Sequence, residues 1–167
     1  MQLCHLLEVY PDIRPQAPAI LHAIAAKYGA HLPQETFARI AQQCLDLDGC
    51  NTTPGALWAC AAILGVPAAT RALLGMGLDP DDATCILIDT PEAVYEPLQG
   101  QEWSQTAMFQ AFTAKVDDEV SMRRLVAAGM IVEPFMIQHA VNSLAGASAK
   151  ILRDAPQASR PAPAPSQ

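Results

Sequence analysis

A dense group of carboxylates stands in the stretch "GLDPDDATCILI", residues 77–88, where Asp79, Asp81 and Asp82 lie close together. Carboxylates grouped in this way can bind calcium or serve in general acid–base catalysis. A calcium loop of the EF-hand type beginning at the first aspartate needs glycine at its sixth position and glutamate at its twelfth. This chain has threonine at both positions, so we expect no calcium site in this stretch.

The cysteines and histidines are the next residues that could carry chemistry. The five cysteines form no CxxC pair, and the four histidines are scattered, so the sequence predicts no metal or cofactor site. Most of the cysteines lie in apolar runs, which is typical of reduced, buried thiols. Cys50, in the loop "DGCNTTPG", and Cys4, beside His5, remain candidate nucleophiles. A small enzyme with a cysteine nucleophile therefore stays open as an alternative.

Composition limits the classes of partner. The chain has 167 residues, of which 51% are hydrophobic, and a formal net charge of −7. One domain of this length can bury a sizeable core. A surface with this charge repels phosphate backbones and anionic lipid, so we expect neither nucleic acid nor a membrane as partner. The first residues have neither the basic region nor the uninterrupted apolar run of an export signal.

The element types follow from periodicity. Apolar residues recur at the spacing of one helical face, and β-branched alternation is absent beyond the short "CILI". The face residues are Phe37, Ile40, Ala41 and Cys44 in the first such helix, Met122, Leu125, Val126 and Gly129 in a later one, and Ile137, Ala140, Val141 and Leu144 in the last. The uncharged residues 49–70 contain two Pro and Gly pairs, which favours a buried helical hairpin over a membrane span. We predict an all-α domain over residues 1–154. The proline-rich residues 155–167 are predicted to form a flexible, extended tail.

Two segments of the chain share a pattern that predicts a repeat. Arg71 precedes an apolar pair and Gly77, and Arg123 precedes an apolar pair and Gly129. Glycine after a helix takes the left-handed conformation that ends it. An acidic residue then follows where the next helix begins, and the same spacing pairs Asp81 with Glu133. The stretch "GLDPDD" is therefore interpreted as the corner between two helices.

The segment "ALWACAAILGVPAATRALLGMGLDPDDA", residues 56–83, resembles an ankyrin repeat. An Ala-Ala pair stands ahead of Gly65, a Leu-Leu pair follows in the second helix, and Gly77, Leu78 and Asp79 close the unit. Residues 109–133 resemble a degenerate second copy. The closing glycines are 52 positions apart, whereas ankyrin repeats recur at about 33 residues, so we expect an insertion around "EPLQGQEWSQ". The fold class implied is a stack of helical hairpins, ankyrin-like or of a related helical repeat.

This resemblance implies a non-catalytic protein–protein interaction module that binds through its loop tips and short first helices. An aromatic residue in a polar segment is a further candidate contact. The predicted partner-binding residues are Asp79, Asp81 and Asp82 at one corner, Met130 and Glu133 at the matching corner, and Trp103. The acidic corner favours another protein with a basic surface. Seven arginines beside three lysines fit a GC-rich bacterial genome. We expect a cytoplasmic adaptor, with secretion as an effector left open.

Overall fold

The computed structural model describes residues 2–88 and 90–156. Over these residues the chain forms helices and turns without any β-strand, which confirms the predicted all-α class. The α-helices are α1 (Gln2–Val9), α2 (Ala17–Tyr28), α3 (Gln34–Asp46), α4 (Pro54–Leu64), α5 (Pro67–Gly75), α6 (Thr84–Leu87), α7 (Glu92–Tyr95), α8 (Gln105–Ala114), α9 (Glu119–Ala127), α10 (Pro134–Asn142) and α11 (Gly146–Asp154).

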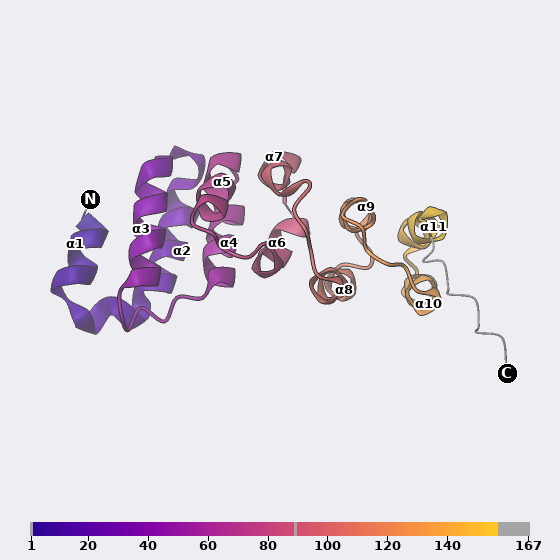
Figure 1. Ribbon diagram of the computed structural model, residues 1–167, viewed down its shortest axis with the longest axis horizontal. Coiled ribbons are helices and arrows are strands. Elements are labelled where there is room, and N and C mark those ends of the chain that lie inside the picture. The colour runs from indigo at the N-terminus through magenta and orange to yellow at the C-terminus, as the bar shows by residue number, and fades with distance from the viewer. Residues whose placement is uncertain (1, 89, 157–167) are drawn as a thin grey trace, which may run out of the picture.

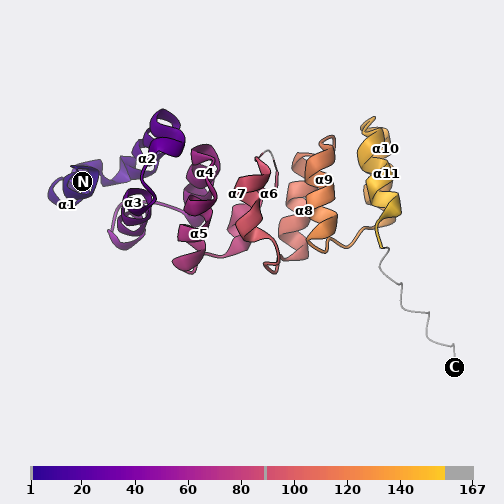
Figure 2. The same ribbon diagram turned by 90° about the horizontal axis from the view of Figure 1, so that it is seen from above.

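Consecutive helices pair, and the pairs stand side by side in an elongated row (Figure 1). Helices α2, α4, α6 and α8 contact one another in sequence along one layer, and α3, α5 and α7 do so along the other. Helix α11 packs on both α10 and α9 and continues the second layer. Figure 2 shows the same succession of pairs from above, from α1 at one end to α11 at the other. The chain is therefore a stack of helical hairpins.

The uncharged residues 49–70 form the hairpin of α4 and α5. Thr53 begins α4, because its side-chain oxygen accepts a hydrogen bond from the Ala56 N–H. Gly65, at φ +69°, ends that helix in the left-handed conformation, and Pro67 begins the next one. The prediction of a buried hairpin is confirmed. Among the described residues, no helix combines the length and apolarity needed to cross a bilayer.

Both predicted closing glycines end helices. Gly77 (φ +77°) follows α5 and Gly129 (φ +92°) follows α9. In each case the next residue folds back: the Leu78 N–H donates to the Leu73 carbonyl at 3.3 Å, and the Met130 N–H donates to the Leu125 carbonyl at 3.0 Å. This hydrogen bond defines a Schellman closure of the helix. The prediction of glycine-closed helices is therefore confirmed at both positions.

Helix α10 ends in the same way, but on a leucine. The Ala145 N–H donates to the Ala140 carbonyl at 2.9 Å, and Leu144 occupies the glycine position with φ +58°. Its side chain is 93% exposed, and Val141 is exposed as well. The predicted buried face of this helix is therefore wrong at these two positions. The helix closes there and turns the leucine outwards.

A shortened hairpin occupies the interval between the two copies. The sequence predicted an insertion around residues 96–105, but the extra unit begins earlier, with the pair α6 and α7, each a single turn of four residues. Pro91 precedes α7 in an extended conformation, and the chain turns at Gly100 (φ +81°) after the 3-10 segment η4 (Glu96–Leu98). A reduced unit therefore stands between full ones in the stack.

The core runs along the stack. The four residues predicted to form one face of α3 are all buried, which confirms that face. Trp58 is the largest fully buried side chain, and its indole N–H donates to the Asp79 carbonyl at 3.2 Å. Helix α11 ends at Asp154. Most of the predicted tail, residues 157–167, lies outside the described residues.

Candidate functional site

The acidic stretch after α5 is a helix start, as predicted. Asp79 is the N-cap of the 3-10 segment η3 (Pro80–Ala83), and its Oδ1 accepts from the Asp81 N–H at 2.9 Å. Pro80 stands at the first helical position, where its missing N–H costs nothing. Asp79 and Asp82 are exposed, and Asp81 is half-buried. Two of the three carboxylates predicted to bind a partner are thus open to solvent.

The second corner corrects the proposed pairing of residues. Glu133 is the N-cap of α10 and directly precedes Pro134. The matching residue at the first corner is the one that precedes Pro80, which is Asp79 and not Asp81. The pairing shifts because the second corner has two more residues, Ile131 and Val132, between the closing glycine and the cap. An N-cap must stand directly before the first helical residue, so the cap and not the glycine sets this register.

Hydrogen bonds join the two corners through the start of α8. Asp81 does not cap the helix, and its Oδ1 instead accepts a hydrogen bond from the Ser104 N–H at 2.8 Å. The next residue, Gln105, donates its amide to the Gly129 carbonyl at 3.0 Å and accepts from the Ile131 N–H at 2.8 Å. The predicted acidic corners therefore lie along one edge of the stack, connected through Ser104 and Gln105.

A small apolar depression opens on this edge between α8 and α10. It has a volume of about 230 Å³, and we call it the phenylalanine hollow. Its lining comprises Gln105, Phe109, Met130, Ile131, Glu133, Phe135 and Met136. Phe109, Ile131 and Phe135 are 40%, 46% and 56% exposed. The two phenyl rings meet edge to face with centroids 5.9 Å apart. Large apolar side chains that gather at the surface mark interaction sites.

The position of Met130 differs from the expectation of an exposed contact. Its side chain is 5% exposed and, with the 2% exposed Met136, belongs to the hydrophobic core beneath the hollow. It packs inwards because it follows the closing glycine, where an apolar residue folds back onto the helix. Phe109, Ile131 and Phe135 provide the exposed apolar surface instead. Sequence reasoning missed them: Ile131 and Phe135 stand at the second corner, but Phe109 lies on α8, far from that corner in the sequence.

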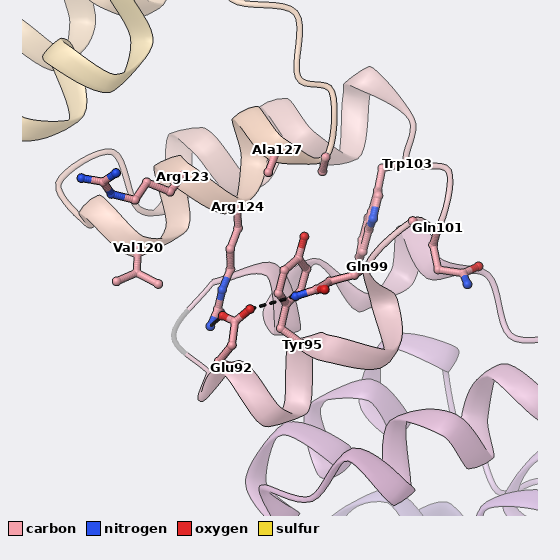
Figure 3. A pocket seen from close by; sticks show the side chains of 11 residues that line it. Glu92, Tyr95, Gln99, Gln101, Trp103, Val120, Arg123, Arg124 and Ala127 are labelled. Atoms are coloured by element: carbon pink, nitrogen blue, oxygen red, sulfur yellow. Dashed lines mark hydrogen bonds and ion pairs between the residues drawn. The ribbon is translucent and has the colours of Figure 1, made fainter. Parts of the chain in front are cut away.

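Trp103 is likewise more buried than expected, at 8% exposure. It stands before the start of α8 and lines a second, larger depression on the other layer, between α7 and α9. Figure 3 shows Trp103 and Tyr95 on one side of this depression and the side chains of α9 on the other. Its volume is about 580 Å³, within the range of ligand-binding clefts. We call it the α7–α9 groove.

The groove exists because α7 is short. A single turn covers only part of α9, so Val120, Arg123 and Ala127 of that helix stay exposed along the wall. The opposite wall continues from Tyr95 into the polar loop that carries Gln99, as drawn in Figure 3. An aromatic surface is thereby combined with amide and charged groups. Of the residues that line this groove, Trp103 alone was predicted from the sequence as a contact.

Arg124 holds α9 to the shortened unit at the floor of the groove. Its side chain is 6% exposed and donates to the Thr90 carbonyl at 2.8 Å and to the Glu92 carboxylate at 3.0 Å. The guanidinium lies over the ring of Tyr95, 4.8 Å from its centroid. Burial raises the pKa of the Tyr95 phenol, and the Arg124 charge opposes that rise. The phenol therefore stays neutral at physiological pH.

The described residues give little support to a chemical site. Cys50 is 1% exposed, and burial raises the pKa of its thiol, against the smaller opposing effect of Arg14. A catalytic thiol needs the opposite change, since the thiolate is the nucleophile. The side chain of Cys4 lies outside the described part of the structure. Within the part that is described, no group of three or more histidine, cysteine or acidic residues could hold a metal ion.

Comparisons with known proteins do not assign the chain to a family. No family model, curated protein or solved structure matches the chain. The site is therefore interpreted from its own geometry.

Proposed function

We propose that the protein is a non-catalytic protein–protein interaction module, built as a degenerate ankyrin-like stack and serving as an adaptor or effector in or from a bacterial cell. The phenylalanine hollow carries this proposal. Three exposed apolar side chains surround a depression at one edge of the stack, where repeat scaffolds present their variable side chains. Recognition through such a surface needs area and shape rather than an activated residue.

The charges around the hollow indicate the kind of partner. Its lining contains one charged residue, Glu133, and no basic residue. The corner with Asp79 and Asp82 lies along the same edge, joined by the bond from the Ser104 N–H to Asp81. We propose that the partner is a protein segment that places an apolar or aromatic side chain between Phe109 and Phe135 and basic residues against the acidic corners. Affinity for such a segment falls as salt rises.

Selection of peptides from a random displayed library, with the whole protein as bait, tests this proposal. The selected peptides should combine an apolar anchor with flanking lysine or arginine. Their affinity should fall at least about tenfold for Phe135→Ser, because the exposed ring is a central contact. Asp82→Asn should weaken binding less and reduce its dependence on salt.

A matched control comes from the other layer. Val120 is 52% exposed and lines the α7–α9 groove, so Val120→Ser removes an exposed apolar side chain without touching the hollow. This variant should bind the selected peptides as the unchanged protein does. Peptides that bind Phe135→Ser and Asp82→Asn with full affinity would show that the hollow is not the binding surface.

The alternative of a cysteine-dependent enzyme has no comparable support. Cys50 is buried, its thiol pKa is raised, and it lines neither the phenylalanine hollow nor the α7–α9 groove.

A further inference from the structure

The α7–α9 groove lies on the layer opposite the phenylalanine hollow and shares no lining residue with it. Two buried aromatic side chains, Tyr95 and Trp103, form one wall, with exposures of 5% and 8%. Gln99 and Gln101 add amide groups beside them, and Glu92 adds a carboxylate whose side chain is 65% exposed. Grooves that combine aromatic surface with amide donors bind extended proline-rich segments, whose polyproline II backbone leaves its carbonyls free.

The chain itself contains such a segment. Residues 157–167, which lie outside the described part of the structure, read "QASRPAPAPSQ" and include Pro161, Pro163 and Pro165. Their single charged residue is Arg160, whereas every acidic residue of the protein lies before Pro156. The segment is therefore basic relative to the rest of the chain, and it has the composition of a polyproline II ligand.

The start of this segment is close to the groove. Pro156 lines a further depression, between α9 and α11, and Arg123 lines both this depression and the α7–α9 groove. One helix, α9, therefore separates Pro156 from the groove. A helix with its side chains is about 10–12 Å across. Four residues of polyproline II conformation cover about 12 Å, and all eleven cover about 34 Å. Arg160 is the fourth residue after Pro156, so the proline run begins where the groove does.

We propose that residues 160–165 of this chain cross α9 and bind in the α7–α9 groove of the same molecule. The prolines pack on Tyr95 and Trp103, and Arg160 lies near the exposed carboxylates of Glu119 and Glu92 that flank the crossing. Because the segment is tethered, its effective concentration is in the millimolar range, about that of short flexible linkers, so even weak contacts fill the groove.

Fluorine NMR of 5-fluorotryptophan-labelled protein tests the proposal, because the chain has two tryptophans. Trp103 lines the groove, and Trp58 is fully buried elsewhere and serves as the internal control. We expect the Trp103 resonance of the full chain to shift when the chain is truncated after Pro156. The full-length triple variant Pro161→Gly, Pro163→Gly, Pro165→Gly should give the truncated position, and the Trp58 resonance should stay in place throughout.

A synthetic peptide of residues 157–167 supplies the second measurement. Added to the truncated protein, it should move the Trp103 resonance towards its position in the full chain. Added to the full chain, it should cause less than a tenth of that shift at equal concentration. The same Trp103 resonance in the full, truncated and triple-variant chains would overturn the proposal. A Trp103 shift in the full chain that disappears on dilution would also overturn it, because the segment would then come from a second copy.

Discussion

The guanidinium of Arg124 lies over the ring of Tyr95, with 4.8 Å between its central carbon and the ring centroid, and so joins α9 to α7. The same group donates to the Thr90 carbonyl, while its Nε has no hydrogen-bond partner. We expect Arg124→Ala to lower the free energy of unfolding by about 3 kcal/mol, because it removes a buried guanidinium with its hydrogen bonds and leaves a cavity. Urea denaturation followed by circular dichroism measures this loss.

Arg123 is the matched control for this prediction. It is the adjacent residue on α9, its side chain is 66% exposed, and it pairs with Glu119 one turn earlier. Exposed pairs of this kind contribute little, so Arg123→Ala should change the free energy of unfolding by less than about 0.5 kcal/mol. Equal losses for the two variants would contradict the role assigned to Arg124.

Leu144 occupies a position that suits glycine. Its φ of +58° is unfavourable for a branched side chain, and the side chain is 93% exposed. Leu144→Gly should therefore raise the free energy of unfolding by about 1 kcal/mol. Gly129→Ala should lower it by a similar amount, since φ is +92° there while a Cβ would meet nothing within 4 Å. Thermal unfolding of both variants checks the two opposite signs.

Asp118 provides a test of pH dependence. It caps α9, with its Oδ2 accepting from the Ser121 N–H and hydroxyl, and the Ser121 hydroxyl bond lowers its pKa below the usual 3.8. A lowered folded pKa means that the stabilisation is complete above the unfolded pKa and is lost as pH falls through the folded value. Asp118→Ala should lower the free energy of unfolding by about 1 kcal/mol at pH 7. The difference should shrink below about pH 4, and a constant difference down to pH 2 would argue against it.

Cys50 should react slowly with thiol reagents in the folded protein. Its burial and raised pKa keep it a protonated thiol at pH 7 to 8. Peptide mapping after pulse alkylation should show labelling of Cys50 at least about 100-fold slower than in urea-unfolded protein. Labelling in the native state as fast as in the unfolded one would revive the alternative of a cysteine nucleophile.

The helical elements could be predicted from local chemistry. Helix-ending glycines, prolines at first helical positions and the apolar spacing of α3 each depend on neighbours within one or two turns, and the structure agrees with them. The face of α10 was predicted wrongly because Leu144 adopts a backbone conformation that leucine seldom takes. The residue types of Val141 and Leu144 do not indicate that the helix closes at this point and leaves both side chains exposed.

The surfaces were harder to predict, because they depend on which helices become neighbours. Phe109 and Phe135 are 26 positions apart in the sequence and meet across α8 and α10. The groove beside Trp103 depends on α7 having a single turn, which removes cover from α9. The burial of Arg124 was not predicted, because two adjacent arginines in a sequence do not indicate which of them is buried. Each of these features is tertiary.

The shortened pair α6 and α7 also has a mechanical consequence. In a stack of repeats, stability is close to a sum of units and nearest-neighbour interfaces. A unit with one turn per helix has little length over which to pack, and in the second layer its junction with α9 depends largely on Arg124. Under pulling force or mild denaturant, the molecule should lose cooperativity at this junction, with the block from α8 to α11 separating from the block that ends at α5.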